Sequence, residues 1–172
     1  DKTFEIKNKN IFNNNETFEI KDVKILPFSI PHDAADPCGF NIFYDNKKVS
    51  IATDIGHIEN NILKQLDGST FMLLESNYEP DILKCSSYPY LLKKRILGPN
   101  GHLSNEDASY IVATLAQSGL NNVMLGHLSK ENNFPELAYK TSINEIIEKN
   151  IDTNKFKLAI ANRDKVDKII EI

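Results

Sequence analysis

Residues 49–56 read Val-Ser-Ile-Ala-Thr-Asp-Ile-Gly, a short apolar run that ends in an aspartate and a glycine. A run of this length, rich in β-branched residues, predicts a buried strand over Val49 to Thr53. The segment Phe40 to Tyr44 precedes it, and the pair Asp45-Asn46 between the two is typical of a turn. The two segments therefore predict a hairpin whose second strand delivers Asp54 at its end.

The rest of the chain predicts more strands in the first half and alternating helices and strands in the second. Apolar or alternating runs predict strands over Thr3 to Lys7, Thr17 to Ile20, Val23 to Ile30, Thr70 to Leu74, Asn122 to Leu125, Lys155 to Ala161 and Val166 to Ile172. Helical spacing predicts helices over Glu59 to Leu66, Pro89 to Leu97, Ser104 to Ser118 and Pro135 to Asn150. Ser104 is expected to cap the third helix, and Gly119 to stop it. Strands packed against helices predict a layered α/β (α+β) fold.

Size and composition are those of a globular protein. The 172 residues suit one domain or a large part of one, with 41% apolar and 26% charged residues. No apolar run approaches the ~20 residues of a membrane span. No signal peptide opens the chain, so a cytoplasmic location is expected. Because the chain opens on Asp1 and reads at once as a strand, we expect a segment upstream of it.

The net charge and the cysteine content exclude few classes of function. The net charge of -4 argues weakly against broad binding to nucleic acid, but a local basic groove is compatible with it. Cys38 and Cys85 lie far apart and match no metal or redox spacing, so reduced thiols are expected.

The chain has four histidines, and three of them lie at predicted element ends. His32 follows a predicted strand. His102 and His127 lie in a repeated Gly-His-Leu-Ser sequence, before a helix and after a strand respectively. Together with Asp54, such side chains could bind a divalent metal, because imidazole and carboxylate are the usual ligands of zinc or manganese. Hydrogen bonding of loop histidines to turns is the alternative.

Six segments carry a resemblance, and they occur in one order. They are Ser29-Ile30-Pro31-His32-Asp33-Ala34-Ala35-Asp36-Pro37, Ala52-Thr53-Asp54-Ile55-Gly56, Leu74-Glu75-Ser76-Asn77, Lys93-Lys94-Arg95-Ile96-Leu97, Gly101-His102-Leu103-Ser104-Asn105-Glu106-Asp107-Ala108 and Gly126-His127-Leu128-Ser129-Lys130-Glu131-Asn132-Asn133. This order resembles the later motifs of the YycJ/WalJ-type branch of the metallo-β-lactamase superfamily, from about His32 to Leu137. The more distant tRNase Z branch is similar in order.

The resemblance implies an αββα sandwich with two divalent metal ions at the edge of its sheets. Residues 1–172 would be the C-terminal half of that domain, with the N-terminal half missing. By the same resemblance His32 is a ligand of one metal and His127 a ligand of the other. Asp54 bridges both metals, around a water that becomes the hydroxide nucleophile. His102 is the candidate for proton transfer to the leaving group, and the alternative for it is a structural role at the start of its helix.

Most of the further candidate residues have two interpretations. Glu75 either orients a ligand histidine or is a buried charge at a strand end. Lys93, Lys94 and Arg95 either contact phosphate or form a solvated helix face. Asn132 and Asn133 support the His127 loop or contact substrate. Asn77 is a further candidate contact, although Tyr78-Glu79 follows it where the family pattern has His-Asp. A surface role is expected for His57.

The superfamily signature HxHxDH is absent from this sequence. Since a catalytic zinc needs about three protein ligands of its own, the chain alone is expected to hold only part of the site. By the resemblance, the first hypothesis is a metal-dependent phosphodiesterase, an exonuclease acting on DNA, whose missing half comes from a partner. The alternatives are a non-catalytic half-fold that associates with a partner chain or a second copy, and a hydrolase of small esters or phosphodiesters with the same metals.

Overall fold

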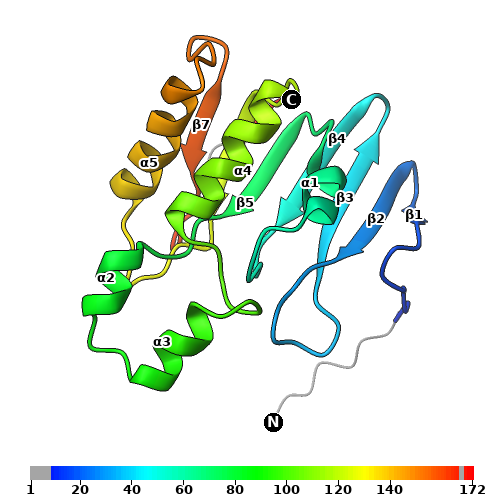
Figure 1. Cartoon of the computed structure of the whole chain (residues 1–172). Helices are drawn as coiled ribbons and strands as arrows, with labels where there is room; N and C mark the ends of the chain where they lie inside the picture. The colour runs from blue at the N-terminus through cyan, green and yellow to red at the C-terminus, as the bar shows by residue number, and fades with distance from the viewer. Residues whose placement is uncertain (1–8, 167–168) are drawn as a thin grey trace.

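The computed structural model describes residues 9–166 and 169–172, whose strands form one seven-stranded sheet in chain order (Figure 1). The antiparallel part consists of β1 (Phe18–Ile20), β2 (Val23–Ser29), β3 (Cys38–Tyr44) and β4 (Lys47–Ala52). The strands β5 (Phe71–Glu75), β6 (Asn122–Gly126) and β7 (Lys157–Ile160) follow in parallel. The sheet is therefore mixed, and the predicted hairpin forms its β3–β4 pair.

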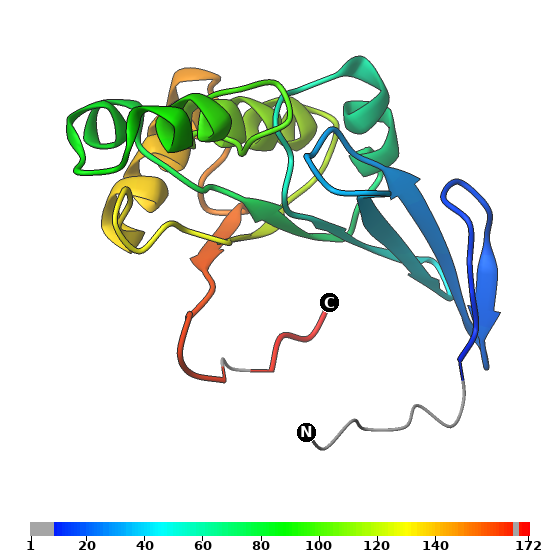
Figure 2. The same ribbon diagram turned by 90° about the horizontal axis from the view of Figure 1, so that it is seen from below.

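The helices make the connections that parallel strands require. They are α1 (Asn60–Leu66) after β4, then α2 (Pro80–Cys85), α3 (Tyr90–Ile96) and α4 (Asn105–Gln117) after β5, and α5 (Pro135–Glu148) after β6. Figure 2 shows the helices gathered on one face of the sheet. Because β4, β5 and β6 run in parallel, their carboxyl ends meet at one edge of the sheet.

The core lies between the sheet and the helices. Leu74 and Leu125 from the strands and Ile111 and Ile146 from the helices are fully buried in it. Each such side chain contributes about 1.5–3 kcal/mol by leaving water. Ser104 caps α4 as predicted, because its Oγ accepts a hydrogen bond of 3.0 Å from the backbone N–H of Asp107.

The opposite face of the sheet is apolar as well. The strand register places Phe40, Ile51, Leu73 and Met124 in one row across β3 to β6, and all four side chains are only partly buried. Among the described residues no helix covers this face (Figure 2). The described part of the chain thus has one sheet and one helical layer, and the layered α/β prediction is confirmed.

The helix α2 and the chain's last segment differ from the sequence predictions. The sequence did not predict α2, a short helix that Pro80 opens. A closing strand over Val166 to Ile172 was wrong for residues 166 and 169–172, which contain no strand, while 167–168 lie outside the described residues. Val166 and Ile169 are exposed. Among the described residues no strand pairs with this segment, so its alternating pattern does not produce a strand. The strand predicted over Thr3 to Lys7 also lies outside the described residues.

No helix in the described ranges has both the length and the apolar character needed to cross a membrane.

Candidate metal centre

The carboxyl ends of the parallel strands bring the predicted site residues together. Asp54 follows β4, Glu75 ends β5, and His127 follows β6, while His102 lies just before α4. Asp54 and His127 have left-handed backbones, with φ of 61° and 55°. This conformation costs about 1–2 kcal/mol in a residue with a side chain, and such strain concentrates at functional sites.

Three imidazoles surround one oxygen of Asp54. Its Oδ1 lies 3.6 Å from His32 Nε2, 3.7 Å from His127 Nε2 and 3.8 Å from His102 Nδ1. These separations are too long for hydrogen bonds. The two distances to Nε2 atoms are comparable with the spacing of two atoms that share one cation through bonds of about 2.0–2.2 Å. The donor set therefore fits a divalent metal, and Asp54 is exposed enough, at 38% of its side chain, to meet one from solvent.

Glu75 lies beneath this group and is fully buried. Its Oε1 accepts hydrogen bonds from Nδ1 of His102 at 2.7 Å and of His127 at 2.6 Å. Its Oε2 accepts from the backbone N–H groups of Ile55, at 2.9 Å, and Leu103, at 3.2 Å. Its ligand atom also lies within 4.8 Å of those of Asp54, His102 and His127. Because both oxygens already accept two hydrogen bonds, Glu75 is better suited to hold the histidines than to bind the metal itself.

These contacts determine which nitrogen of each ring is free. An ionised carboxylate and a carbonyl oxygen only accept hydrogen bonds, so the ring nitrogen that faces one carries the hydrogen. The Nδ1 of His127 faces Glu75, and the Nδ1 of His32 faces the carbonyl oxygen of Gly101 at 2.9 Å. The Nε2 lone pairs of both rings are then directed towards Asp54, as a metal ligand requires.

His57 lies outside this arrangement. Its Nδ1 faces the carbonyl oxygen of Pro99 at 2.6 Å, and its Nε2 lies 2.9 Å from Glu59 Oε1. Both ring nitrogens therefore face acceptors, and neither is offered to a metal. This placement agrees with the surface role expected for His57.

The hydrogen bonds around Glu75 shift two pKa values in opposite directions. Burial alone would raise the pKa of Glu75, but the hydrogen bonds from His102 and His127, the charge of His102 and the backbone hydrogen bond from Ile55 together keep this pKa below its ordinary value. The hydrogen bond to Glu75 raises the pKa of His127, against the effect of burial. When no metal is bound, this hydrogen bond therefore favours the charged forms of both side chains, the carboxylate of Glu75 and the imidazolium of His127.

A pH dependence of stability follows for the metal-free chain. Glu75 contributes fully above its ordinary pKa of 4.5 and loses this contribution as the pH falls through its lowered pKa. His127 contributes fully below its ordinary pKa of 6.5 and loses it as the pH rises through its raised pKa. The difference in unfolding free energy between the parent and Glu75→Gln should peak between these values. Urea unfolding in chelator, below, within and above this window, measures it, and an equal difference at every pH would contradict the assignment.

Arg95 is paired with an acidic side chain. Its Nε and Nη2 both donate to the carboxylate of Asp33, the latter at 2.8 Å. Asp33 in turn lies 3.4 Å from His32 Nε2. The hydrogen bond from Arg95 lowers the pKa of Asp33, which stays an anion beside His32. Arg95 is therefore not a free cation, and its phosphate contact stays a prediction.

Three asparagines of the motifs, Asn77, Asn132 and Asn133, lie around the loop of His127. Asn77 donates from Nδ2 to the carbonyl oxygen of His127 at 2.9 Å. Asn133 donates to the carbonyl oxygens of Ser76, at 2.8 Å, and Asn77, at 3.2 Å. Asn132 is fully buried, and its Oδ1 has no hydrogen-bond partner among the described residues. All three are placed to support the loop, and buried Asn132 has no surface to offer a substrate.

Sequence reasoning missed two residues whose hydrogen-bond partners lie far away in the sequence. Asp33, although part of a quoted motif, was not singled out, since nothing in the sequence links it to Arg95. The buried Asn105 was also missed. It accepts from Ser76 Oγ at 2.6 Å and from Asn133 Nδ2 at 2.8 Å, and so ties the ends of β5 and β6 together. The sequence feature that could have pointed to Asn105 is its place after Ser104, directly behind the first Gly-His-Leu.

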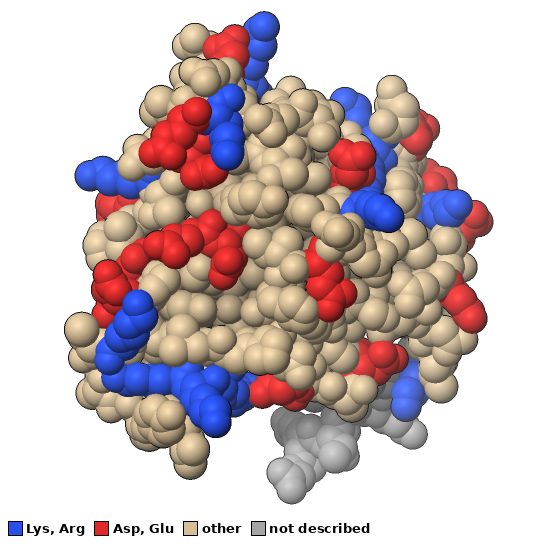
Figure 3. All heavy atoms as spheres, viewed as in Figure 1, with Lys and Arg blue, Asp and Glu red and all other residues tan. Residues whose placement is uncertain are grey.

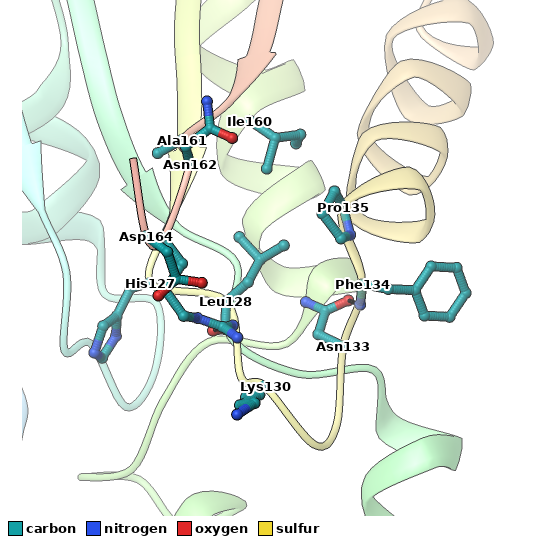
Figure 4. Close-up of a pocket in the computed structure, with 11 residues that line it drawn as sticks. His127, Leu128, Lys130, Asn133, Phe134, Pro135, Ile160, Ala161, Asn162 and Asp164 are labelled. Carbon is teal, nitrogen blue, oxygen red and sulfur yellow. Dashed lines mark hydrogen bonds between the residues drawn. The ribbon is translucent and has the colours of Figure 1, made fainter. Parts of the chain in front are cut away.

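A cavity of about 550 Å³ adjoins the site (Figure 4). It lies between the loop after β6 and the segment after β7, with His127 at its border and Lys130 and Phe134 in its lining. Arg163 donates to the carbonyl oxygen of Leu128 and so joins the two segments. The cavity gives a substrate room beside the candidate ligands.

Known proteins resemble this chain in sequence and in fold. Residues 3–127 match the family described as "Beta-lactamase superfamily domain". The chain is 33% identical to an exodeoxyribonuclease WalJ of Streptococcus pneumoniae serotype 2 over 95% of its length and 61% of the relative's. It is 31% identical to an exodeoxyribonuclease YycJ of Bacillus anthracis, over 81% of this chain and 53% of that protein. The chain thus spans less than two thirds of the length of these relatives.

Solved structures agree on the fold. The metallo-β-lactamase fold protein YhfI from Bacillus subtilis superposes with a TM-score of 0.65 at 15% identity, covering 92% of this chain and 54% of that one. Zn(2+)-bound PqqB from Methylobacterium extorquens gives a TM-score of 0.54 at 18% identity, covering 87% of this chain and 52% of that one. From the family match and this architecture, we conclude that the chain belongs to the metallo-β-lactamase superfamily.

Proposed function

We propose that residues 1–172 are part of a metallo-β-lactamase domain that hydrolyses phosphodiester bonds in DNA as an exonuclease. The observation that carries the proposal is the convergence of His32, His102 and His127 on Asp54 Oδ1, above the buried Glu75. The names of the WalJ and YycJ relatives support DNA as the substrate. A cytoplasmic location stays a prediction from the sequence.

The proposed site takes two divalent ions, zinc or manganese. His32 would hold one ion and His127 the other, with Asp54 between them. Ions held there would lower the pKa of water towards 7 and stabilise negative charge on a phosphate. Since these side chains are too few for two ions, we propose that a segment with the sequence HxHxDH supplies the other ligands.

The remaining side chains have roles that need no metal. Glu75 keeps His102 and His127 in one orientation and one tautomer. With Nδ1 of His102 bonded to Glu75, its Nε2 is the atom that can carry a proton to the leaving oxygen. Asp33 and Arg95 form a charge pair beside His32, which helps to hold that side of the site.

A second candidate function rests on the apolar face of the sheet. The row of Phe40, Ile51, Leu73 and Met124 is only partly buried, and apolar faces of this kind mark association. The chain would then be a non-catalytic half-fold bound to a partner or to a second copy. A monomer that melts cooperatively would contradict this reading.

An activity assay tests the proposal. The chain would be incubated with Zn²⁺ or Mn²⁺, with and without a polypeptide that carries the HxHxDH sequence. End-labelled DNA, a small phosphodiester and a thioester would be offered. We expect both phosphodiesters to be cleaved in the mixture and the thioester to stay intact. Cleavage of the small substrates alone would indicate the small-molecule hydrolase, and no cleavage of any substrate would contradict the enzyme.

A further inference from the structure

The segment between β5 and α4 forms an arm on the outside of the domain. We use "arm" for residues 79–101, which contain α2 and α3 (Figure 1). Just outside it, Tyr78 pairs with Ser104 in a β-bridge, and the backbone N–H of Asn105 donates to Tyr78 at 2.9 Å. The chain therefore leaves and re-enters the domain at neighbouring points, so the two ends of the arm lie side by side.

The arm has a small core of its own. Leu83 and Ile96 are buried with Tyr78, and Tyr88 and Leu92 pack against them. Lys93 Nζ donates to the carbonyl oxygens of Lys84, at 2.6 Å, and Ser86, at 2.7 Å, and so ties α3 to the end of α2. These contacts hold the surface of the arm in one shape.

A groove of about 700 Å³ runs along this surface. Its basic and aromatic lining consists of Lys84, Tyr88, Tyr90, Lys93 and Lys94, and Leu97, Gly98 and Pro99 complete it. Of the three lysines, Lys84 is paired with Asp81 outside the lining. Among the residues that the structure describes, no carboxylate lines it. Figure 3 shows Lys and Arg side chains gathered in one band over α2 and α3, at the lower left.

Two of these side chains are free to meet a ligand. Tyr90 is 75% exposed. Lys94 makes no hydrogen bond or ion pair within the described ranges. Residues four apart on a helix share a face, so the ring of Tyr90 and the ammonium group of Lys94 lie on the same side of α3. An aromatic face beside an unpaired cation is the combination that binds a base and its phosphate.

The chain leads directly from the groove to the candidate metal centre. Pro99 lines the groove, and Gly101, two residues further along the chain, accepts a hydrogen bond from His32. The backbone N–H of His102 donates to Ile96 at the end of α3, at 3.1 Å. A Cβ on Gly101 would lie 2.1 Å from the carbonyl oxygen of Ile96, so only glycine allows this close packing. A strand that occupies the groove would therefore continue towards His32 and His102.

We propose that the groove of the arm binds single-stranded DNA next to the bond that is cut, with a base stacked on Tyr90 and phosphate beside Lys94. This inference rests on the proposed nuclease function. Single strands fit the groove because their bases expose faces for stacking, whereas the bases of a duplex are stacked on one another. A protein partner fits less well, since lysine is depleted at protein interfaces.

The test is binding of a labelled thymidine oligomer to the chain in chelator, measured by fluorescence anisotropy at several salt concentrations. The double variant Y90A/K94E is compared with Y139A/K140E, which changes an exposed Tyr and Lys on α5. We expect Y90A/K94E to weaken binding by about 10-fold or more, because it removes both the stacking surface for a base and the cation beside the phosphate. It should also make the salt dependence shallower. The α5 variant should bind as the parent does.

Further variants and ligands complete the test. Tyr90→Phe keeps the aromatic face and should keep most of the affinity, and thermal melting confirms that each variant folds. Unchanged binding by Y90A/K94E, an equal loss in both double variants, or preference for blunt duplex would overturn the proposal. Because chelator removes metal, this result is independent of cleavage. If the groove binds DNA and the activity assay shows no cleavage, the nuclease function fails while the binding site stands.

Discussion

Asp54→Asn should lower metal affinity and DNA hydrolysis by at least about a hundredfold, since loss of even an outer-shell partner typically costs 10–100-fold. Asp54 Oδ1 is the atom on which three imidazoles converge. The neutral amide of asparagine removes the charge that would hold the ions together. Asparagine tolerates the left-handed backbone at this position, so the fold should persist. Calorimetric titration with Zn²⁺ and the activity assay, both on the mixture with the polypeptide that carries the HxHxDH sequence, measure the two effects.

Asp45→Asn is the matched control. Asp45 also has a left-handed backbone, with φ of 50°, and lies in the turn before β4, at the opposite end of that strand from Asp54. The same change of charge there should leave metal affinity and hydrolysis as in the parent. Equal behaviour of the two variants would show that Asp54 has no special part in the site.

Glu75→Gln should weaken metal binding by about 10–100-fold without removing a ligand in our assignment. A glutamine offers one acceptor and one NH₂ group where Glu75 accepts four hydrogen bonds. The NH₂ group would face an N–H of His102 or His127, or would force that ring into the other tautomer. In His127 the other tautomer places the hydrogen on Nε2, the atom directed towards Asp54.

The same substitution should also lower the unfolding free energy, on the order of 1–3 kcal/mol for a buried group left without a partner. Competition with a chromogenic chelator, in the mixture with the HxHxDH polypeptide, gives the metal affinity, and urea unfolding of the chain gives the stability. Glu79→Gln is the control, because Glu79 accepts one side-chain hydrogen bond, from Asn105 at 3.0 Å, and lies apart from the histidines. An E75Q variant with parental metal affinity would mean that Glu75 is only a structural charge.

The sequence predicted the strand ends well because alternation and apolar runs directly reflect burial. Asp54 and His127 follow such runs, and the parallel order of β4 to β6 then places them at one edge. For Glu75 the sequence left two interpretations open. Its position at a strand end is visible in the sequence, but the two imidazoles that donate to it come from 27 and 52 residues further along the chain.

Other features depend on contacts that no local pattern contains. The pairing of Arg95 with Asp33 spans 62 residues, so the basic run Lys93 to Arg95 gave no sign that its members differ in their partners. Only the structure separates Arg95, paired with an acid, from Lys94, which is free among the described residues. The strand expected at Val166 to Ile172 fails for the converse reason. Its alternation is real, but the described residues there have no neighbouring strand.

Metal content of the purified chain, alone and mixed with a polypeptide that carries the HxHxDH sequence, tests the central claim most directly. Both samples would be loaded with zinc or manganese, dialysed and measured by elemental analysis. The assignment of His32, Asp54 and His127 as part of a shared site predicts tightly held metal in the mixture and little in the chain alone. Absence of metal from both samples would contradict the metal centre and leave the non-catalytic half-fold as the better account.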